Sequence, residues 1–243
     1  MKRQGEFINN LSGKLEYKSF NPSNLPPIPE IIIDNNMMNL LLETSRILGR
    51  LHEKASNIQN KDLYISMSIY KEALLSSQIE GTHATLDDLF DPNIDNNTNL
   101  DVSVVINYIK ASNYANTLLG KFPLSSRFLK QVHKVLIDGV RGKDSNPGEF
   151  RRTQNWIGAQ GSSLLNAKFI TPNVIDMLEA MSTLEHFIHY NEDTHVLLKI
   201  ALTHYQFETI HPFLDGNGRI GRLLIGLMLK EYGLLSHDVL SIS

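Results

Sequence analysis

The spacing of hydrophobic positions predicts a mainly helical chain. Behind Asp34, which is suited to cap a helix, apolar residues recur at helical spacing from Met37 to Leu51. A second helix is predicted over about 61–80, ending at Gly81, because glycine readily takes the left-handed conformation that ends helices. Further amphipathic stretches lie at about 101–119, 125–138, 173–190, 195–209 and 219–232. We therefore expect an all-α fold.

Three stretches interrupt the helical pattern. The prolines of NPSNLPPIPEI (21–31) favour an extended lead-in. The turn formers of DPNIDNNTN (91–99) predict a linker, so that the chain divides into parts 1–98 and 99–243. Residues 153–171 hold two short β-compatible pieces around a Gly-Ser turn and predict one β-hairpin. The hairpin would use Trp156 and Ile157 on one side and Phe169 and Ile170 on the other.

Composition narrows the class of protein. A net charge of -3 and a pI near 6.3 argue against a nucleic-acid coat, so no direct nucleic-acid partner is expected. The sequence has no cysteine, which fits a reducing compartment, and no apolar run of the length that a bilayer requires. We expect a cytoplasmic protein that does not enter a membrane.

The stretch HPFLDGNGRIGR (211–222) has the composition of an anion site. Gly216 and Gly218 can take positive φ at the start of a helix whose first amides have no internal partner. Those amides, with that of Asn217, would form a cradle for phosphate. Arg219 and Arg222 are three residues apart and project from one helix face, which suits a polyphosphate.

Two further residues of this stretch add chemistry. Asp215 can hold Mg²⁺ together with phosphate oxygens and water. His211 can take a proton from an incoming hydroxyl as a general base. The pattern GxxxxGK[ST] of the common P-loop is absent. The alternative interpretation is a glycine-rich helix start beside a buried histidine.

HPFLDGNGR followed by Arg222 resembles the signature of the Fic (filamentation induced by cAMP) family at every fixed position. This resemblance implies a helical fold with a β-hairpin flap and the transfer of AMP from ATP to a hydroxyl of a target protein. It assigns His211 as the base, Asp215 as the Mg²⁺ ligand and Gly216–Gly218 as the anion hole. It also places Arg219 on the phosphates and Arg222 on the γ-phosphate.

A second motif, SSQIEG (76–81), ends the helix predicted over 61–80. Ser76 and Glu80 are four residues apart and share a helix face. A solvated surface glutamate is the ordinary interpretation. The motif, however, resembles the inhibitory motif of Fic proteins whose inhibitory helix precedes the catalytic core. That resemblance, which extends to the N-terminal region of many bacterial Fic proteins, implies that Glu80 pairs with Arg222 and blocks placement of the γ-phosphate.

The predicted hairpin is the candidate flap, whose edge would pair with an extended peptide of the target protein. A small structural ribbon is the alternative. The final segment, LLSHDVLSIS, stops where many Fic proteins with this N-terminal region continue, so we expect a chain truncated at its C-terminus. Arg151 and Arg152, just before the hairpin, could reach a phosphate or pair with local acids, and we expect the structural role.

The resulting functional hypothesis is an autoinhibited, Mg²⁺-dependent and ATP-dependent protein adenylyltransferase. It would modify a serine, threonine or tyrosine of an unidentified target protein and also itself. Removal of AMP from a modified protein, and nucleotide sensing without turnover, remain the alternatives. A homo-oligomer is left open. The histidines of HFIHYNEDTH (186–195) match no common zinc spacing and are not expected to bind metal.

Overall fold

The computed structural model describes residues 4–13, 16–91, 99–139, 146–159 and 161–243. Most of the predicted linker at 91–99 lies outside these residues. The chain divides into two compact units. The first comprises Met1–Ile31 and Glu149–Asn217, and the second comprises Ile32–Gly148 and Gly218–Ser243. We describe each unit by itself.

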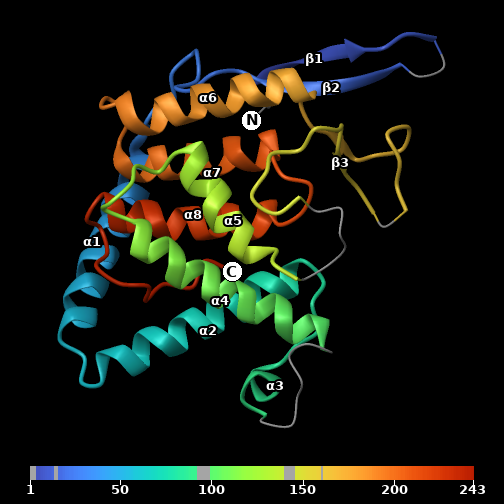
Figure 1. Cartoon of the computed structure of the whole chain (residues 1–243). Coiled ribbons are helices and arrows are strands. Elements are labelled where there is room, and N and C mark those ends of the chain that lie inside the picture. Colours follow the sequence, from blue (N-terminus) through green and yellow to red (C-terminus); the bar gives the residue numbers. More distant parts are fainter. Residues whose placement is uncertain (1–3, 14–15, 92–98, 140–145, 160) are drawn as a thin grey trace. The chain divides into compact units, whose positions relative to one another are not determined.

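The first unit combines two helices with two β-hairpins. Helices α6 (Val174–Tyr190) and α7 (Val196–Ile210) lie side by side in Figure 1. Strands β1 (Gly5–Asn10) and β2 (Tyr17–Pro22) pair antiparallel, as do β3 (Trp156–Ile157) and β4 (Phe169–Ile170). The ring centroids of Phe20 on β2 and Phe169 on β4 are 5.8 Å apart. This aromatic contact joins the two hairpins.

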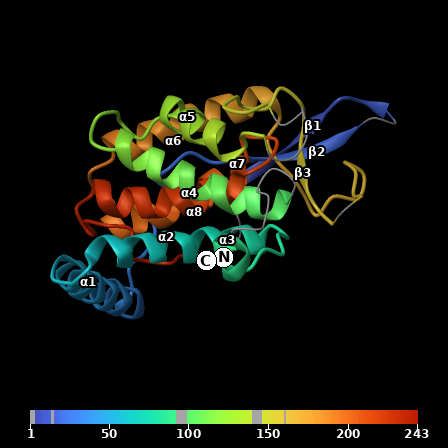
Figure 2. The same cartoon turned by 60° about the horizontal axis from the view of Figure 1, so that its bottom comes forward.

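The second unit is helical and is organised around one buried helix, α4. It contains α1 (Asn35–Ser56), α2 (Lys61–Ile79), α3 (Leu86–Phe90), α4 (Leu100–Leu118), α5 (Ser126–Leu136) and nearly all of α8 (Asn217–Glu231). Helix α4 lies against both α2 and α5, and Figure 2 shows it running beside α2. Val105, Tyr108, Ala111 and Ala115 of α4 are fully or almost fully buried. Their spacing of three and four residues explains why this helix forms the centre of the core.

Short polar residues and a glycine mark three helix termini, and those at Asp34 and Gly81 form where the sequence predicts them. Asp34 accepts a hydrogen bond from the backbone N–H of Met37 at the start of α1. Thr85 and Asp88 form a reciprocal capping box at the start of α3. Gly81 has a φ of 88° directly after the C-cap of α2. These short polar residues and one glycine therefore set the boundaries of three helices.

The prediction of a mainly helical fold with a hairpin at 153–171 is confirmed. The N-terminal hairpin β1–β2 was not predicted. Strand β1 has the sequence GEFINN and buries none of its side chains fully, so it lacks the alternation of buried and exposed positions that identifies a strand. In its partner β2 the neighbouring residues Ser19 and Phe20 are both buried, although they point to opposite faces, so β2 shows no regular alternation either.

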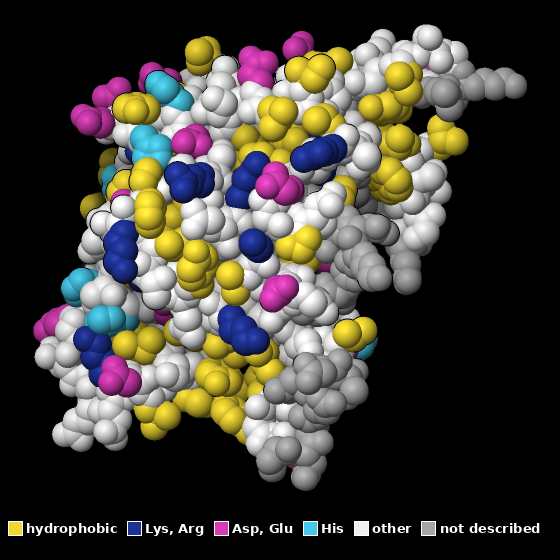
Figure 3. Space-filling model, viewed as in Figure 1, with side chains coloured by type: hydrophobic (Ala, Val, Ile, Leu, Met, Phe, Trp, Pro, Cys, Tyr) yellow, Lys and Arg dark blue, Asp and Glu magenta, His cyan; other side chains and the backbone are white. Residues whose placement is uncertain are grey.

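Several hydrophobic side chains remain at the surface. Leu63, Tyr64 and Met67 of α2 are exposed, and Figure 3 shows hydrophobic side chains along this helix in the lower part of the view. Within the described residues, no helix combines the length and the apolarity needed to cross a membrane.

Candidate active site

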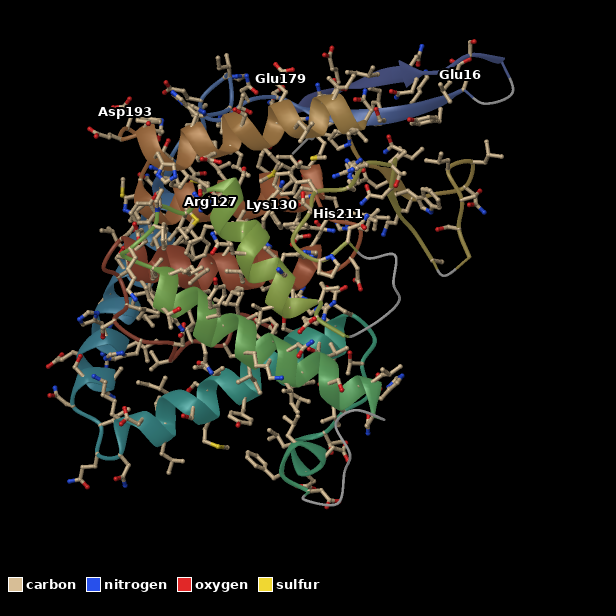
Figure 4. All side chains as sticks on the ribbon, in the orientation of Figure 1. Glu16, Arg127, Lys130, Glu179, Asp193 and His211 are labelled. Carbon is tan, nitrogen blue, oxygen red and sulfur yellow. The ribbon has the colours of Figure 1, made fainter. Side chains whose placement is uncertain are left out.

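His211 follows α7 directly, as Figure 4 shows, and ends that helix in a left-handed conformation with a φ of 52°. Its Nδ1 atom lies 3.4 Å from the backbone carbonyl oxygen of Glu208. A carbonyl only accepts, so a hydrogen bond at this contact requires the proton on Nδ1. In a neutral imidazole the acceptor lone pair is then on Nε2, which is the tautomer that a base acting through Nε2 needs.

The loop after His211 is anchored by its own residues. The phenyl ring of Phe213 is completely buried, with its centroid 5.2 Å from that of Phe150 and 6.5 Å from that of Phe207. The Asn217 side chain accepts from the Phe213 N–H and donates to the Phe213 carbonyl, both at 2.8 Å. Phe213 therefore anchors the loop in the core of the first unit. Because the Asn217 side chain is already hydrogen-bonded to the loop, only its backbone N–H would contribute to an anion site.

The predicted cradle lies at the start of α8. Gly216 has a φ of 76°, a conformation that favours glycine, and its N–H donates to Asp215 Oδ1 at 2.6 Å. Helix α8 begins at the next residue, Asn217. Arg219, in its first turn, is buried. Gly216 thus takes the positive φ that the sequence predicts, whereas Gly218 does not and instead lies in the first turn of α8.

In the second unit, Arg222 is held by Ser76 of α2 and by Glu80, which is the C-cap of that helix. Its Nε donates to Ser76 Oγ at 2.7 Å, and its second terminal nitrogen donates to the Ser76 carbonyl at 2.9 Å. The same nitrogen forms an ion pair with Glu80 Oε1 at 2.8 Å. The Arg222 side chain is 13% exposed and that of Glu80 is 38% exposed. The pairing of Glu80 with Arg222 that the resemblance implies is therefore present.

Glu80 also contacts the first turn of α8. A β-carbon placed on Gly218 would lie 2.2 Å from Glu80 Oε1 and 3.2 Å from its carboxyl carbon. Real side chains do not approach this closely, so the carboxylate needs a glycine at position 218. Since Glu80 ends α2, where the helix dipole disfavours an anion, Arg222 and the start of α8 supply the compensating positive charge.

A buried polar cluster lies along the same face of α2. Burial, followed by the charge of Glu72, raises the pKa of the Tyr108 hydroxyl, which therefore stays neutral at physiological pH. Glu72 accepts from the N–H of Ile242 at 2.8 Å and from the hydroxyl of Ser241 at 2.9 Å. Glu72, Ser76 and Glu80 are spaced by four residues, so one face of α2 binds both the last residues of the chain and Arg222.

The hairpin β3–β4 presents partly exposed apolar side chains. Trp156 and Ile157 of β3 are exposed, and the Trp156 indole N–H donates to the Ser162 carbonyl at 3.1 Å. At the base of the hairpin, Asn155 Nδ2 donates to the carbonyl of Phe213 at 3.0 Å. The hairpin base is thus bonded to the loop that follows His211, a connection that the sequence pattern did not predict.

Arg151 is a second connection that the sequence did not reveal. We expected a structural role for this residue, and its side chain is indeed buried, with only 1% exposed. Its Nε donates to the His211 carbonyl at 3.0 Å across 60 positions of sequence. Neither periodicity nor motif spacing identifies a contact of this kind. The pair Arg151 and Arg152 directly before a hairpin was the one available signal, and it does not say which of the two is buried.

This mainly helical fold places a glycine turn at the start of α8, shortly after the histidine that ends α7. Residues 123–229 match the model of the Fic/DOC family, and residues 38–117 match that of the Fic/DOC family N-terminal region. The two matches together cover most of the chain. The chain belongs to the Fic/DOC family.

Named relatives support the family assignment. The chain is 26% identical over 236 residues to the protein adenylyltransferase Fic of Drosophila mojavensis, covering 88% of this chain and 43% of that protein. It is 26% identical over 214 residues to the corresponding protein of Drosophila grimshawi, covering 83% of this chain and 40% of that protein. The chain therefore spans about two fifths of the length of these relatives.

Solved structures support the fold. A Fic family protein from Desulfovibrio desulfuricans superposes with a TM-score of 0.65 at 22% identity, covering 84% of this chain and 60% of that one. A Fic domain containing signaling protein from Bacteroides thetaiotaomicron gives a TM-score of 0.65 at 20% identity, covering 78% of this chain and 73% of that one. At these identities the likeness concerns the fold alone.

Proposed function

We propose that this protein transfers AMP from ATP to a serine, threonine or tyrosine hydroxyl of a target protein and of itself, and that Glu80 represses the transfer. The named adenylyltransferase relatives support the activity at the level of the family. The observation that carries the proposal for this chain is the Glu80 carboxylate held on Arg222 and against Gly218. Arg222 is the residue to which the family resemblance assigns the γ-phosphate.

His211 is the proposed general base. The contact of Nδ1 with the Glu208 carbonyl supports the tautomer of the neutral imidazole that carries its proton on Nδ1 and can accept a proton at Nε2. In the proposed step, the target hydroxyl gives its proton to Nε2 while its oxygen forms a bond to the α-phosphorus of ATP. The bond from the α-phosphorus to the oxygen that bridges to the β-phosphorus breaks. Pyrophosphate leaves with that electron pair.

The start of α8 is the proposed phosphate site. Backbone N–H groups of Gly216 to Gly218 lie at the positive end of the helix, where an anion is stabilised. Arg219 and Arg222 would add two permanent positive charges. In this proposal, Arg222 must leave Glu80 before it can bind the γ-phosphate.

The residues present fit a magnesium ion that arrives with the nucleotide. Within the described residues, no group of three or more metal-binding side chains forms a ready-made metal site. One partly exposed carboxylate, that of Asp215, stands beside the glycine turn. Mg²⁺ is commonly held by one or two carboxylates together with phosphates and waters, and Asp215 would hold it here. When bound, the ion would neutralise charge on the leaving pyrophosphate.

Glu80 represses transfer by competing with phosphate for the same cation. Its carboxylate occupies the side of Gly218 that has no side chain, and it satisfies one terminal nitrogen of Arg222. A γ-phosphate brought to Arg222 would meet this carboxylate, and the two like charges repel each other. Because Glu80 is partly exposed, its replacement by water requires no opening of a core.

The hairpin β3–β4 is the proposed contact for the target. Its exposed Trp156 and Ile157, with Phe169 and Ile170 on the partner strand, offer a short edge and apolar side chains to an extended peptide. The hydrogen bond from Asn155 to Phe213 links this hairpin to the His211 loop. Strand addition here would therefore present an acceptor side chain near the end of α7.

The proposal is tested by incubating three forms of the protein with ATP labelled at its α-phosphate. Wild type should acquire little label, Glu80→Gly should acquire much more, and Glu80→Gly with His211→Ala should acquire none. Mass spectrometry should locate AMP on a hydroxyl side chain. Equal labelling of wild type and Glu80→Gly contradicts repression, and a mass addition of phosphate in place of AMP contradicts the proposed transfer of AMP.

A second arm of this test separates transfer from removal. A protein carrying AMP on a hydroxyl, prepared with the Glu80→Gly form, is incubated with wild type without ATP. We expect the modification to persist. Its loss with wild type, but not with His211→Ala, would favour removal of AMP as the activity.

A further inference from the structure

Arg151 is the largest fully buried side chain in the described part of the molecule. It lies in the first unit, in the stretch that runs from Glu149 to the hairpin β3–β4. Its guanidinium donates to the backbone carbonyls of His211 at 3.0 Å, Thr153 at 3.1 Å, Pro172 at 2.6 Å and Ile210 at 3.4 Å. Its own N–H donates to the Pro212 carbonyl at 2.9 Å. One residue therefore bonds to five carbonyls.

The guanidinium keeps its charge in this place. Burial lowers the pKa of Arg151 to about 10, and the nearby Tyr17 partly opposes that shift. The side chain is therefore still protonated at neutral pH. Hydrogen bonds from a charged donor are roughly twice as strong as those between neutral groups, so the carbonyls that it binds are firmly oriented.

The four carbonyls bound by the side chain come from two places. Thr153 and Pro172 flank the hairpin β3–β4 on either side, whereas Ile210 and His211 form the end of α7. The planar fork of arginine reaches acceptors in several directions at once, and the single ammonium of lysine does not. Arg151 thus joins both ends of the hairpin to the backbone of the proposed base.

His211 needs such support because of its backbone conformation. Its φ of 52° lies in the left-handed region, which an L-residue with a side chain adopts at a cost of roughly 1 kcal/mol or more. The hydrogen bond from Arg151 Nε to the His211 carbonyl fixes the peptide plane that follows. The direction of that peptide plane helps to set where the imidazole points.

We propose that Arg151 is a positioning residue for the transfer reaction, which holds the His211 backbone and the base of the hairpin in one fixed geometry. This inference rests on the proposed function, because His211 must be the base for its position to affect the rate. Arg151 contacts no reacting group in this proposal. Its effect on the rate passes through the backbone of His211.

The matched control is Lys199, a second buried cation of the same unit. It is 6% exposed, lies on α7, and donates through Nζ to the Asn191 carbonyl at 2.6 Å. Lys199→Met removes a buried charge from a backbone carbonyl without touching His211 or the hairpin. A general effect of lost stability should therefore appear equally in Lys199→Met and in Arg151→Lys.

The experiment places Arg151→Lys and Lys199→Met separately in the Glu80→Gly protein. Rates of AMP transfer at saturating ATP are divided by the folded fraction, which thermal unfolding measures. We expect Arg151→Lys to lower the rate by about tenfold to a hundredfold, since a displacement of about 1 Å of a catalytic group has effects of this size. The ATP affinity of the Arg151→Lys form, measured by titration calorimetry, should change less than about threefold. Lys199→Met should keep the rate of the Glu80→Gly protein.

A readout without activity accompanies the rates. With histidine labelled by ¹⁵N and ¹³C, the backbone signals of His211, assigned by their loss in His211→Ala, report its left-handed conformation. We expect these signals to shift in Arg151→Lys and to stay in Lys199→Met. Unchanged His211 signals overturn the inference, and so does a rate per folded molecule equal to that of the parent. If the Glu80→Gly protein itself transfers no AMP, the proposed function is contradicted instead. The backbone signals of His211 then still decide whether Arg151 positions this residue.

Discussion

The two ends of the motif at 211–222 are held in different ways. His211 ends α7 in a loop whose backbone is bonded to the buried Arg151 and closed by Asn217 on Phe213. Arg222 is held through its side chain, by Ser76 and by the partly exposed carboxylate of Glu80. The first arrangement fixes the backbone of a half-buried residue through a buried arginine, whereas the second holds a mostly buried side chain through one buried partner and one partly exposed partner.

This difference indicates which half of the motif can be regulated. A buried arginine that is removed leaves several carbonyls without partners, each at a cost of about 1–3 kcal/mol. An ion pair with one partly exposed partner contributes roughly 1 kcal/mol or less. We therefore expect the backbone of His211 to keep its position, and Arg222 to exchange Glu80 for another partner more easily. The predictions below test this contrast, from the largest effect to the smallest.

The largest effect is expected at the fixed end of the motif. His211→Ala in the Glu80→Gly protein should lower AMP transfer by about 10²–10⁴, because it removes a general base. ATP affinity should stay within a few-fold of the parent, since the proposed phosphate ligands begin at Gly216. Transfer rates with labelled ATP and titration calorimetry measure the two quantities. Equal loss of rate and of affinity would mean that His211 supports binding and does not act as a base.

The next effect concerns the residue that Arg222 must release. Glu80→Gly should tighten ATP binding by about 5–150-fold, the usual range for coupling between two contacts that compete. AMP, which lacks the β- and γ-phosphates, should gain much less. Calorimetry with both nucleotides on wild type and Glu80→Gly measures this. An equal gain for AMP and ATP would contradict competition at the γ-phosphate.

Ser76 allows a finer test of the same contact. Ser76→Ala removes the hydroxyl that accepts from Arg222 Nε and leaves the Ser76 carbonyl bond intact. One hydrogen bond to a charged group contributes about 1.5 kcal/mol, which is roughly a factor of ten, so a gain in ATP affinity of up to about tenfold is expected. The gain should be smaller than that of Glu80→Gly. The reverse order would place the inhibitory contact on Ser76.

Much of the fold could be predicted from local patterns. Asp34, Thr85 and Gly81 act within a few residues of their positions, so the helix termini follow from the sequence. The hairpin β1–β2 could not be predicted, because its strands have little buried face and depend on contacts such as Phe20 with Phe169 across 149 residues of chain. Interactions between residues close in sequence determine where the helices end, whereas the weakly patterned strand β1 forms only through contacts with residues distant in sequence.

The candidate site shows the same division. The glycine turn and the helix start at 216–219 follow from residue type, and the resemblance to the Fic family supplies the pair of Glu80 with Arg222. The bond from Arg151 to His211 depends on how α7 and the hairpin come together within the first unit. Ser76 is predicted as a neighbour of Glu80, but its carbonyl as a partner of Arg222 follows only from the backbone geometry at the end of α2.

The smallest effect tests the energetic side of the contrast directly. Glu80→Gln keeps the shape of the side chain and removes its charge, so the free energy of unfolding should fall by about 1 kcal/mol or less. Arg151→Met, a change of similar volume in the core, should lower it by several kcal/mol, because it leaves buried carbonyls unpaired. Chemical denaturation followed by circular dichroism compares the two variants. Because the ion pair is electrostatic and partly exposed, added salt should reduce the Glu80→Gln effect further and leave that of Arg151→Met nearly unchanged. Equal losses in the two variants would show that the Arg222 contact is as fixed as the His211 loop, and that its release by ATP cannot be the regulated step.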